Sequence, residues 1–228
     1  MDSANLFPLL ETIDQDYEIL VFSPAWSSQL QRLAKRATDA IGSIFLLVLL
    51  SPLLLFLAVL VKLSSPGPVF YRSSLMGEGG YPFVGYKFRS MYVNADEVKH
   101  QLAHLNEMRG PVFKITRDPR ITPLGRWIRK YSLDELPQLY SVLKGDMSLV
   151  GPRPPLVSEY RLFTAYQKQK MSVRPGITCL WQVNGRNDIS DLDDWVRLDL
   201  KYIRTWSLWL DLAILLKTVV VVVLGSGK

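Results

Sequence analysis

The longest apolar segment of the chain covers residues 40–61, which are 22 residues without a charged side chain. At a rise of about 1.5 Å per residue, a helix of this length can cross a bilayer. Ser51 and Pro52 lie near its midpoint, and a proline in a helix interior removes a hydrogen bond and bends the axis. Each arm then matches half a hydrocarbon core. The pattern favours a kinked spanning helix and a re-entrant helix about equally.

Basic residues flank both ends of this segment. Arg32, Lys35 and Arg36 precede it, and Lys62 and Arg72 follow it. Positive residues favour the cytoplasmic side of a membrane, and here both flanks carry them. Residues 31–64 are therefore predicted to form a membrane helix with a break. Residues 1–30 are mixed and slightly acidic, show no signal-peptide pattern, and are predicted to form an N-terminal appendage.

Residues 65–207 have the pattern of a small domain with both strands and helices. Residues 69–72 and 83–88 are rich in β-prone side chains, with Gly79 and Gly80 between them, so a β-hairpin is predicted. A polar helix is predicted over residues 94–108, and further helical pieces alternate with proline-rich loops. The fold class is therefore α+β and mostly helical, with cytosolic helices beside the membrane helix.

The C-terminal tail, residues 208–228, is strongly apolar up to residue 224 but carries Asp211 and Lys217. Charged side chains are costly at the centre of a bilayer. We therefore predict an amphipathic helix that lies at the membrane interface and does not cross it.

The composition of the chain indicates what kind of partner it binds. The net charge is +6 and the pI is near 9.4, which suits nucleic acid, an acidic membrane surface or a phosphorylated substrate. Nucleic acid is disfavoured, because the basic residues lie in separate proline-rich loops rather than in a stripe with aromatic side chains between them. Cys179 is the single cysteine, which excludes an internal disulfide and fits a reducing cytosol.

The candidate chemistry centres on Asp134 and Glu135. Ser132 and Glu135 have the spacing of a capping box, an apolar stripe follows, and Gly145 is a C-terminal stop. The two carboxylates are therefore predicted in the first turn of a short helix, where the dipole keeps them ionised and attracts phosphate. Adjacent carboxylates can hold Mg²⁺ beside a diphosphate. Taken alone, however, such a pair more often only caps a helix.

The loops on either side present cations. Arg153 lies within a run of three prolines, Arg174 precedes Pro175, and Arg186 lies in a tight turn. Lys87 and Arg89 end the second β-prone segment. A stiff loop loses little entropy when its arginine binds phosphate. Each cation alone could be a surface salt-bridge residue, but several rigid loops with a cation indicate a phosphate site.

Five motifs occur in an order that resembles the bacterial sugar transferases, the monotopic phosphoglycosyl transferases that act on polyprenyl phosphate. They are Lys87-Phe88-Arg89-Ser90-Met91, SLDELPQL at residues 132–139, Gly151-Pro152-Arg153-Pro154, RPGIT at residues 174–178 and QVNGR at residues 182–186. The resemblance runs from about Arg32 to the C-terminus. It also favours re-entrance, because Ser51-Pro52 matches the break in the family's re-entrant helix. Cys179 occupies a position where the family usually has glycine. Because cysteine adopts a positive φ less easily than glycine, the sequence does not determine the backbone conformation there.

The resemblance implies roles for the candidate residues. Asp134 would be the nucleophile and Glu135 its partner, with Mg²⁺ at the pair. Cations would bind the phosphates or the nucleotide, and Arg129 would face lipid headgroups or the carrier phosphate. The remaining cations in this set are Lys87, Arg89, Arg153, Arg174 and Arg186.

The implied reaction transfers a sugar-1-phosphate, with a hexose the first guess, from a UDP-sugar to undecaprenyl phosphate with release of UMP. It would be a first membrane step in exopolysaccharide, capsule or O-antigen assembly, on the cytoplasmic face of the bacterial inner membrane. A homodimer is possible. The alternatives are a non-catalytic membrane scaffold and a conventional lipid-linked glycosyltransferase that releases UDP.

Overall fold

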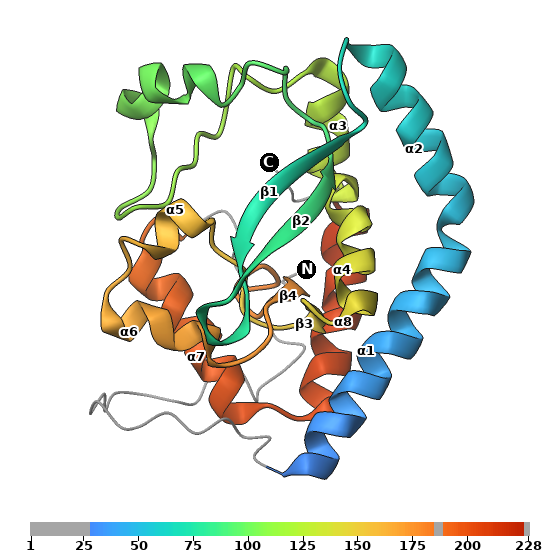
Figure 1. The fold of residues 1–228 in the computed structure, drawn as a ribbon, viewed down its shortest axis with the longest axis vertical. Helices are drawn as coiled ribbons and strands as arrows, with labels where there is room; N and C mark the ends of the chain where they lie inside the picture. Colours follow the sequence, from blue (N-terminus) through green and yellow to red (C-terminus); the bar gives the residue numbers. More distant parts are fainter. Residues whose placement is uncertain (1–27, 185–188, 226–228) are drawn as a thin grey trace, which may run out of the picture.

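The computed structural model describes residues 28–184 and 189–225, which form a mostly helical α+β fold. Helices α1 (Gln29–Leu49) and α2 (Ser51–Ser64) run as one bent arm along one side of the molecule (Figure 1). The bend is 63°. Pro52 lies in the first turn of α2, where its missing N–H costs no hydrogen bond. The predicted break at Ser51 and Pro52 is confirmed.

The apolar length of a membrane span is divided between the two helices of this bent pair. Within the described ranges, no single helix is both long and apolar enough to cross a membrane, whereas α1 and α2 together reach that length and composition. The outward faces of both helices carry large apolar side chains. They include Ile41, Ile44, Phe45, Val48 and Leu49 on α1, and Leu55, Phe56, Val59 and Leu63 on α2.

The basic residues before the apolar segment are turned partly inward. Lys35 is buried and its Nζ lies 2.7 Å from Asp211 Oδ2 and 3.2 Å from Asp39 Oδ1. Arg36 donates to the carbonyl oxygens of Val142 and Leu143 at 2.7 and 2.6 Å. It therefore caps the C-terminus of α4 (Leu139–Lys144), beside which α1 lies (Figure 1). These two residues hold α1 on the rest of the fold.

The predicted β-hairpin is confirmed. Strands β1 (Phe70–Met76) and β2 (Pro82–Phe88) pair antiparallel, and the 3₁₀ turn η2 (Glu78–Gly80) joins them. Gly79 and Gly80 have φ of 67° and 80°, a region that suits glycine. Strand β2 packs against the 3₁₀ helix η4 (Leu133–Gln138). The hairpin thereby brings its last residues beside the predicted carboxylate pair.

An irregular arm, residues 92–120, follows the hairpin and leads to α3 (Pro123–Lys130). It contains one 3₁₀ helix, η3 (Glu97–Leu105), which is shorter and tighter than the α-helix predicted over residues 94–108. The Asn106 side chain accepts from the Met108 and Lys114 amides and donates to the carbonyl oxygens of Met108 and Val112. This asparagine organises a loop in place of further helix.

The C-terminal half contains a parallel strand pair that the sequence did not indicate. Strands β3 (Ser148–Val150) and β4 (Gly176–Thr178) lie within the larger hydrophobic core. Short helices α5 (Val157–Tyr160), α6 (Ala165–Lys168) and η5 (Gln169–Ser172) connect them. Helices α7 (Leu192–Thr205) and α8 (Leu208–Val223) close the fold.

Helix α8 confirms the predicted C-terminal helix but places its charges differently. Asp211 is buried, accepts from Tyr202 Oη at 2.8 Å and pairs with Lys35. Lys217 donates to Asn184 Oδ1 at 3.0 Å. Both charges therefore face protein partners. The exposed side of the helix is apolar and includes Trp209, Leu212, Leu216, Val219, Val220 and Val223. Because Asp211 and Lys217 face protein, their charges do not by themselves exclude this helix from the bilayer, which was the reason given for the predicted interfacial position.

Candidate functional site

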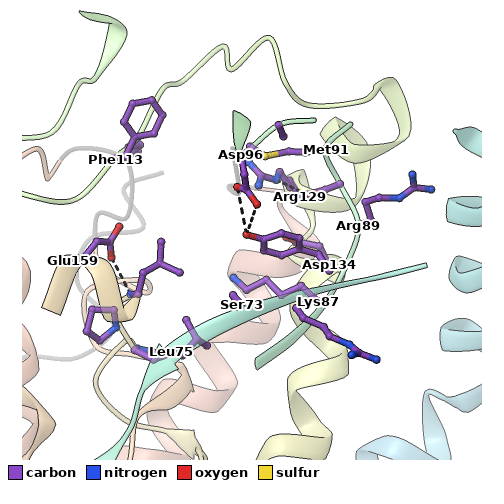
Figure 2. A pocket seen from close by; sticks show the side chains of 18 of the residues that line it. Ser73, Leu75, Lys87, Arg89, Met91, Asp96, Phe113, Arg129, Asp134 and Glu159 are labelled. Carbon is purple, nitrogen blue, oxygen red and sulfur yellow. Dashed lines mark hydrogen bonds between the residues drawn. The ribbon is translucent and has the colours of Figure 1, made fainter. Parts of the chain in front are cut away.

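A cavity of about 830 Å³ lies between the hairpin, the arm and the proline-rich loop before α5 (Figure 2). Asp134 lines it together with four of the predicted cations, Lys87, Arg89, Arg129 and Arg153. A volume of this size is ordinary for a binding site of a small molecule or cofactor. The structure therefore brings residues from three of the sequence motifs to one concave site.

A strained turn positions Asp134. Ser132 has φ 53°, and no other residue except glycine has a positive φ in the part of the chain that the structure describes. Its amide donates to the Arg129 carbonyl at the end of α3, and the Glu135 amide donates to the Ser132 carbonyl. The predicted side-chain capping box is not formed, because Ser132 is left-handed rather than extended. Asp134 and Glu135 still lie in the first turn of η4 and are both buried.

Glu135 binds two of the cations that line the cavity. Its Oε1 accepts from Lys87 Nζ at 2.6 Å and from Arg153 Nη2 at 3.2 Å. The charge of Glu135 is the largest influence on Arg153 and raises the pKa of its guanidinium. The same guanidinium lies 5.9 Å from the centre of the Trp181 ring. Glu135 thus fixes Lys87 and Arg153 beside Asp134.

The other predicted cations have different surroundings. Arg129 donates from Nε to Ser90 Oγ at 2.8 Å and lines the cavity. The Arg89 guanidinium points away from Asp134 (Figure 2) and donates to the carbonyl oxygens of Val61, Ser65 and Pro66 at the end of α2. Arg89 therefore caps a helix, although it is also among the residues that line the cavity.

Two of the predicted cations, Arg174 and Arg186, are not among the described residues that line the cavity. The Arg174 Nε lies 3.3 Å from Glu78 Oε2 in an exposed pair beside the hairpin turn. Arg186 lies outside the described residues.

The structure also answers the question of the backbone at Cys179. This residue does not adopt a positive φ, and its thiol donates to Gln182 Oε1 at 3.1 Å. Cysteine thus fits this position without strain.

The donor atoms fit a magnesium ion only in part. Over residues 28–184 and 189–225, no three His, Cys, Asp or Glu side chains come close enough to hold a metal. Mg²⁺ is usually bound by one or two carboxylates together with substrate phosphates and water. The Asp134–Glu135 pair suits such an arrangement, in which a diphosphate supplies the remaining oxygen ligands.

Three residues of the cavity had no signal in the sequence. Tyr71 donates from Oη to Asp96 at 3.2 Å, and burial, with Asp96, raises the pKa of this tyrosine. Phe113 and Glu159 line another part of the cavity. In the sequence Tyr71 resembles an ordinary strand residue, and Phe113 and Glu159 resemble ordinary loop and helix residues, because only the tertiary fold brings β1, the arm and α5 to one cavity.

A cavity that combines a buried carboxylate with fixed cations suits an enzyme that acts on phosphorylated substrates. The family model for the bacterial sugar transferases matches residues 30–225, and the chain belongs to this family.

Several curated proteins are similar to this chain. It is 45% identical over 213 residues to the galactosyl transferase CpsE of Streptococcus agalactiae, with 93% of this chain and 47% of CpsE covered. It is 46% identical over 200 residues to the undecaprenyl-phosphate galactose phosphotransferase of Salmonella typhimurium, covering 86% of this chain and 42% of that protein. The exopolysaccharide production protein ExoY of Rhizobium meliloti is 41% identical over 200 residues, covering 86% and 88%. The chain thus spans about half the length of the first two relatives.

Proposed function

We propose that this protein transfers a hexose-1-phosphate from a UDP-hexose to undecaprenyl phosphate and releases UMP. The observation that carries the proposal is the presence of Asp134 in one cavity with Lys87, Arg129 and Arg153. Three cations beside one carboxylate suit a substrate with two phosphates. Relatives named as undecaprenyl-phosphate galactose and glucose phosphotransferases support the choice of donor and acceptor.

In the first step, an Asp134 carboxylate oxygen attacks the phosphorus that bears the sugar. The bond from this phosphorus to the bridging oxygen breaks, and UMP leaves with the electron pair. The product is an acyl phosphate that joins Asp134 to the sugar phosphate. Lys87 and Arg153, which Glu135 holds in place at 2.6 and 3.2 Å, stabilise the charge that develops on the phosphate oxygens.

In the second step, a phosphate oxygen of the carrier lipid attacks the same phosphorus. The bond to the Asp134 oxygen breaks, the carboxylate is regenerated, and a lipid-linked diphosphate sugar is formed. Arg129 lines the cavity and is oriented by Ser90, which suits it to the carrier phosphate. Two half-reactions need no simultaneous binding of a soluble donor and a lipid acceptor, so ping-pong kinetics follow.

Asp134 and Glu135 would hold Mg²⁺ together with the donor diphosphate. The ion would supply charge neutralisation of the leaving phosphate. Glu135 would combine this role with its contacts to Lys87 and Arg153, because a carboxylate can accept up to about four hydrogen bonds or ligand contacts.

The bent pair α1–α2 would enter and leave the cytoplasmic leaflet of the bacterial inner membrane, and α8 would lie at its surface. The exposed apolar side chains of all three helices support this arrangement. The cavity would then face the cytoplasm, where UDP-sugars are available, while the carrier phosphate would reach it from the leaflet.

The test is the nucleotide product. Purified protein in detergent is given undecaprenyl phosphate and a panel of UDP-hexoses, and the released nucleotide is identified. UMP is expected, because the bond between the two phosphates breaks. Release of UDP would indicate a conventional glycosyltransferase, and no lipid product from any donor would favour a non-catalytic scaffold.

A further inference from the structure

The cavity contains a carboxylate that the proposed reaction does not use. Glu159 lines it from the first turn of α5, on the side away from Asp134, Lys87 and Arg129 (Figure 2). Its Oε2 accepts from the Leu156 amide at 3.0 Å and so caps the start of this helix. The second oxygen, Oε1, has no hydrogen-bond partner among the residues that the structure describes.

Each cation that acts on Glu159 is already engaged with another group. Lys170 Nζ lies 2.5 Å from Asp199, and Arg153 binds Glu135. Lys99 Nζ lies 5.2 Å from the centre of the Phe113 ring. None of them comes within salt-bridge distance of Glu159 in the described structure. Burial raises the pKa of Glu159, and these charges, with the Leu156 amide, oppose that effect. The carboxylate is thus oriented but not neutralised by an ion pair.

A metal ion or a phosphate does not suit this carboxylate. In the described ranges Glu159 forms no group of three potential ligands with Asp134 and Glu135, so it stands apart from the proposed magnesium position. A carboxylate repels phosphate, and the cations that act on Glu159, namely Lys99, Arg153 and Lys170, are each engaged with another group. An isoprenoid chain would leave a buried carboxylate oxygen without a partner, which is costly.

Hydroxyl groups are the remaining kind of ligand that suits the Glu159 carboxylate. An ionised carboxylate only accepts hydrogen bonds, and neighbouring hydroxyls of a sugar ring donate them. Phe113 lies on the same side of the cavity as Glu159 (Figure 2), and Trp181 also lines it. Aromatic rings offer apolar surface against which the C–H face of a sugar can pack. Resting on the proposed function, we propose that Glu159 binds hydroxyl groups of a sugar ring of the donor, the hexose or the ribose, and determines donor specificity.

The variant Glu159→Gln isolates this role. The amide oxygen of the glutamine can still accept from the Leu156 amide, so the helix cap is kept. The oxygen that faces the cavity is replaced by an uncharged NH₂ group, which donates hydrogen bonds and cannot accept them. A charged hydrogen bond is worth about 10- to 100-fold in specificity. We expect kcat/KM for the best UDP-hexose to fall by this factor. Glu97→Gln, which removes an exposed carboxylate outside the cavity, should leave kcat/KM unchanged.

Inhibition by UMP distinguishes the two rings. If the hexose is bound, Glu159→Gln weakens UMP inhibition little, and wild-type discrimination between UDP-glucose and UDP-galactose shrinks. If the ribose is bound, UMP inhibition weakens by the same factor, and the preference for UMP over 2′-deoxy-UMP disappears.

The proposal is overturned if Glu159→Gln keeps wild-type kcat/KM for every donor, or if UMP binding weakens without any change in preference over 2′-deoxy-UMP. Glu159→Asp, which keeps the charge and shortens its reach, provides a second variant should the first not fold. The proposed function fails separately, if the wild-type protein releases no UMP from any donor.

Discussion

Asp134 and Glu135 are adjacent in sequence but meet different groups. Asp134 lines the cavity, whereas Glu135 Oε1 binds Lys87 and Arg153. The left-handed Ser132 sets both at the start of η4. Strained backbone of this kind is maintained where the surrounding structure supports it, often at functional sites. This geometry supports the proposed roles, in which Asp134 attacks the donor and Glu135 positions the cations.

Loss of the Glu135 charge should disorganise two cations at once. In Glu135→Gln we expect turnover to fall by about 100-fold or more, as when a preorganised charge-stabilising group is lost. The measurement is kcat for UMP release, with membrane attachment and thermal unfolding as checks of the fold. Glu78→Gln removes a carboxylate from the exposed Arg174 pair and is the matched control. Near-normal turnover of Glu135→Gln would contradict the positioning role.

At the scale of elements, strong local patterns predicted structure and long-range contacts did not. The hairpin has β-prone strands and two glycines with positive φ, and the helix break has a proline, so both were predictable. Strands β3 and β4 have three residues each and pair across the chain, which leaves no periodic signal. The inward turn of Asp211 depends on its contact with Lys35, from the opposite end of the sequence.

The candidate site was predictable to the same extent. Local motifs pointed to Asp134, Lys87 and Arg153, which do line one cavity. Motif membership could not separate them from Arg89, whose guanidinium caps α2. Glu159 reads as a surface glutamate, because its role depends on how the arm folds over α5.

The arm that covers the cavity depends on a buried pair. Arg120 Nη2 lies 2.6 Å from Asp118 Oδ2, and its guanidinium lies 5.0 Å from the centre of the Phe113 ring. Burial opposes ionisation of Asp118, but the hydrogen bonds and charge of Arg120 outweigh it and lower the pKa of this carboxyl. Its contribution to stability is therefore present above the unfolded pKa, about 3.9, and is lost as the pH falls through the lower folded value.

The pH dependence of Asp118→Asn tests this arrangement. We expect the variant to melt at a lower temperature than the wild type at neutral pH. The difference should narrow only when the pH falls below the ordinary range of aspartate. Melting curves of both proteins across that range are the measurement. A difference that stayed constant down to the lowest pH would refute the ionic contribution of Asp118.

A second buried pair joins η5 to α7. Lys170 and Asp199 are almost completely buried and lie 2.5 Å apart. Burial raises the pKa of Asp199, and the charge of Lys170 opposes it. Asp199→Asn leaves a buried lysine without its counter-charge and should lower the free energy of unfolding by about 3–5 kcal/mol.

Thermal unfolding in detergent measures this loss, expected as a decrease in Tm of about 6–20 °C. Asp194→Asn is the control on the same helix, because its pair with Arg197 is exposed on both sides. Exposed pairs contribute about 0–1 kcal/mol, so its Tm should hardly change. Equal effects of the two variants would contradict the importance of burial.

At the scale of the whole molecule, the bent arm and α8 present apolar side chains outward. If α1–α2 is re-entrant, both its ends lie in the cytoplasm. We expect cysteines introduced at Leu30 and Pro68 to be labelled only from the cytoplasmic side. Cys179 is buried and should give little background. Labelling of the first site from the periplasm alone would exclude re-entrance, and Pro52→Ala should shift the chain toward spanning, because the break is weakened.

Helix α8 gives an independent test of membrane association. Its 16 residues are short for a span, and its exposed side is apolar. Trp209→Gln together with Val219→Gln should weaken attachment to vesicles, because two apolar groups leave the interface. Donor affinity should change little. A C-terminal reporter that is active only in the periplasm would contradict the interfacial position.

The central claim is that Asp134 forms a covalent bond to the sugar phosphate. The most direct measurement is peptide mass spectrometry of protein given a labelled UDP-hexose without acceptor lipid. We predict a hexose phosphate on Asp134, release of one UMP per adduct, and loss of the adduct when undecaprenyl phosphate is added. Asp134→Asn should remain folded and membrane-bound but form none. A label on another residue, or near-normal transfer by Asp134→Asn, would contradict the mechanism.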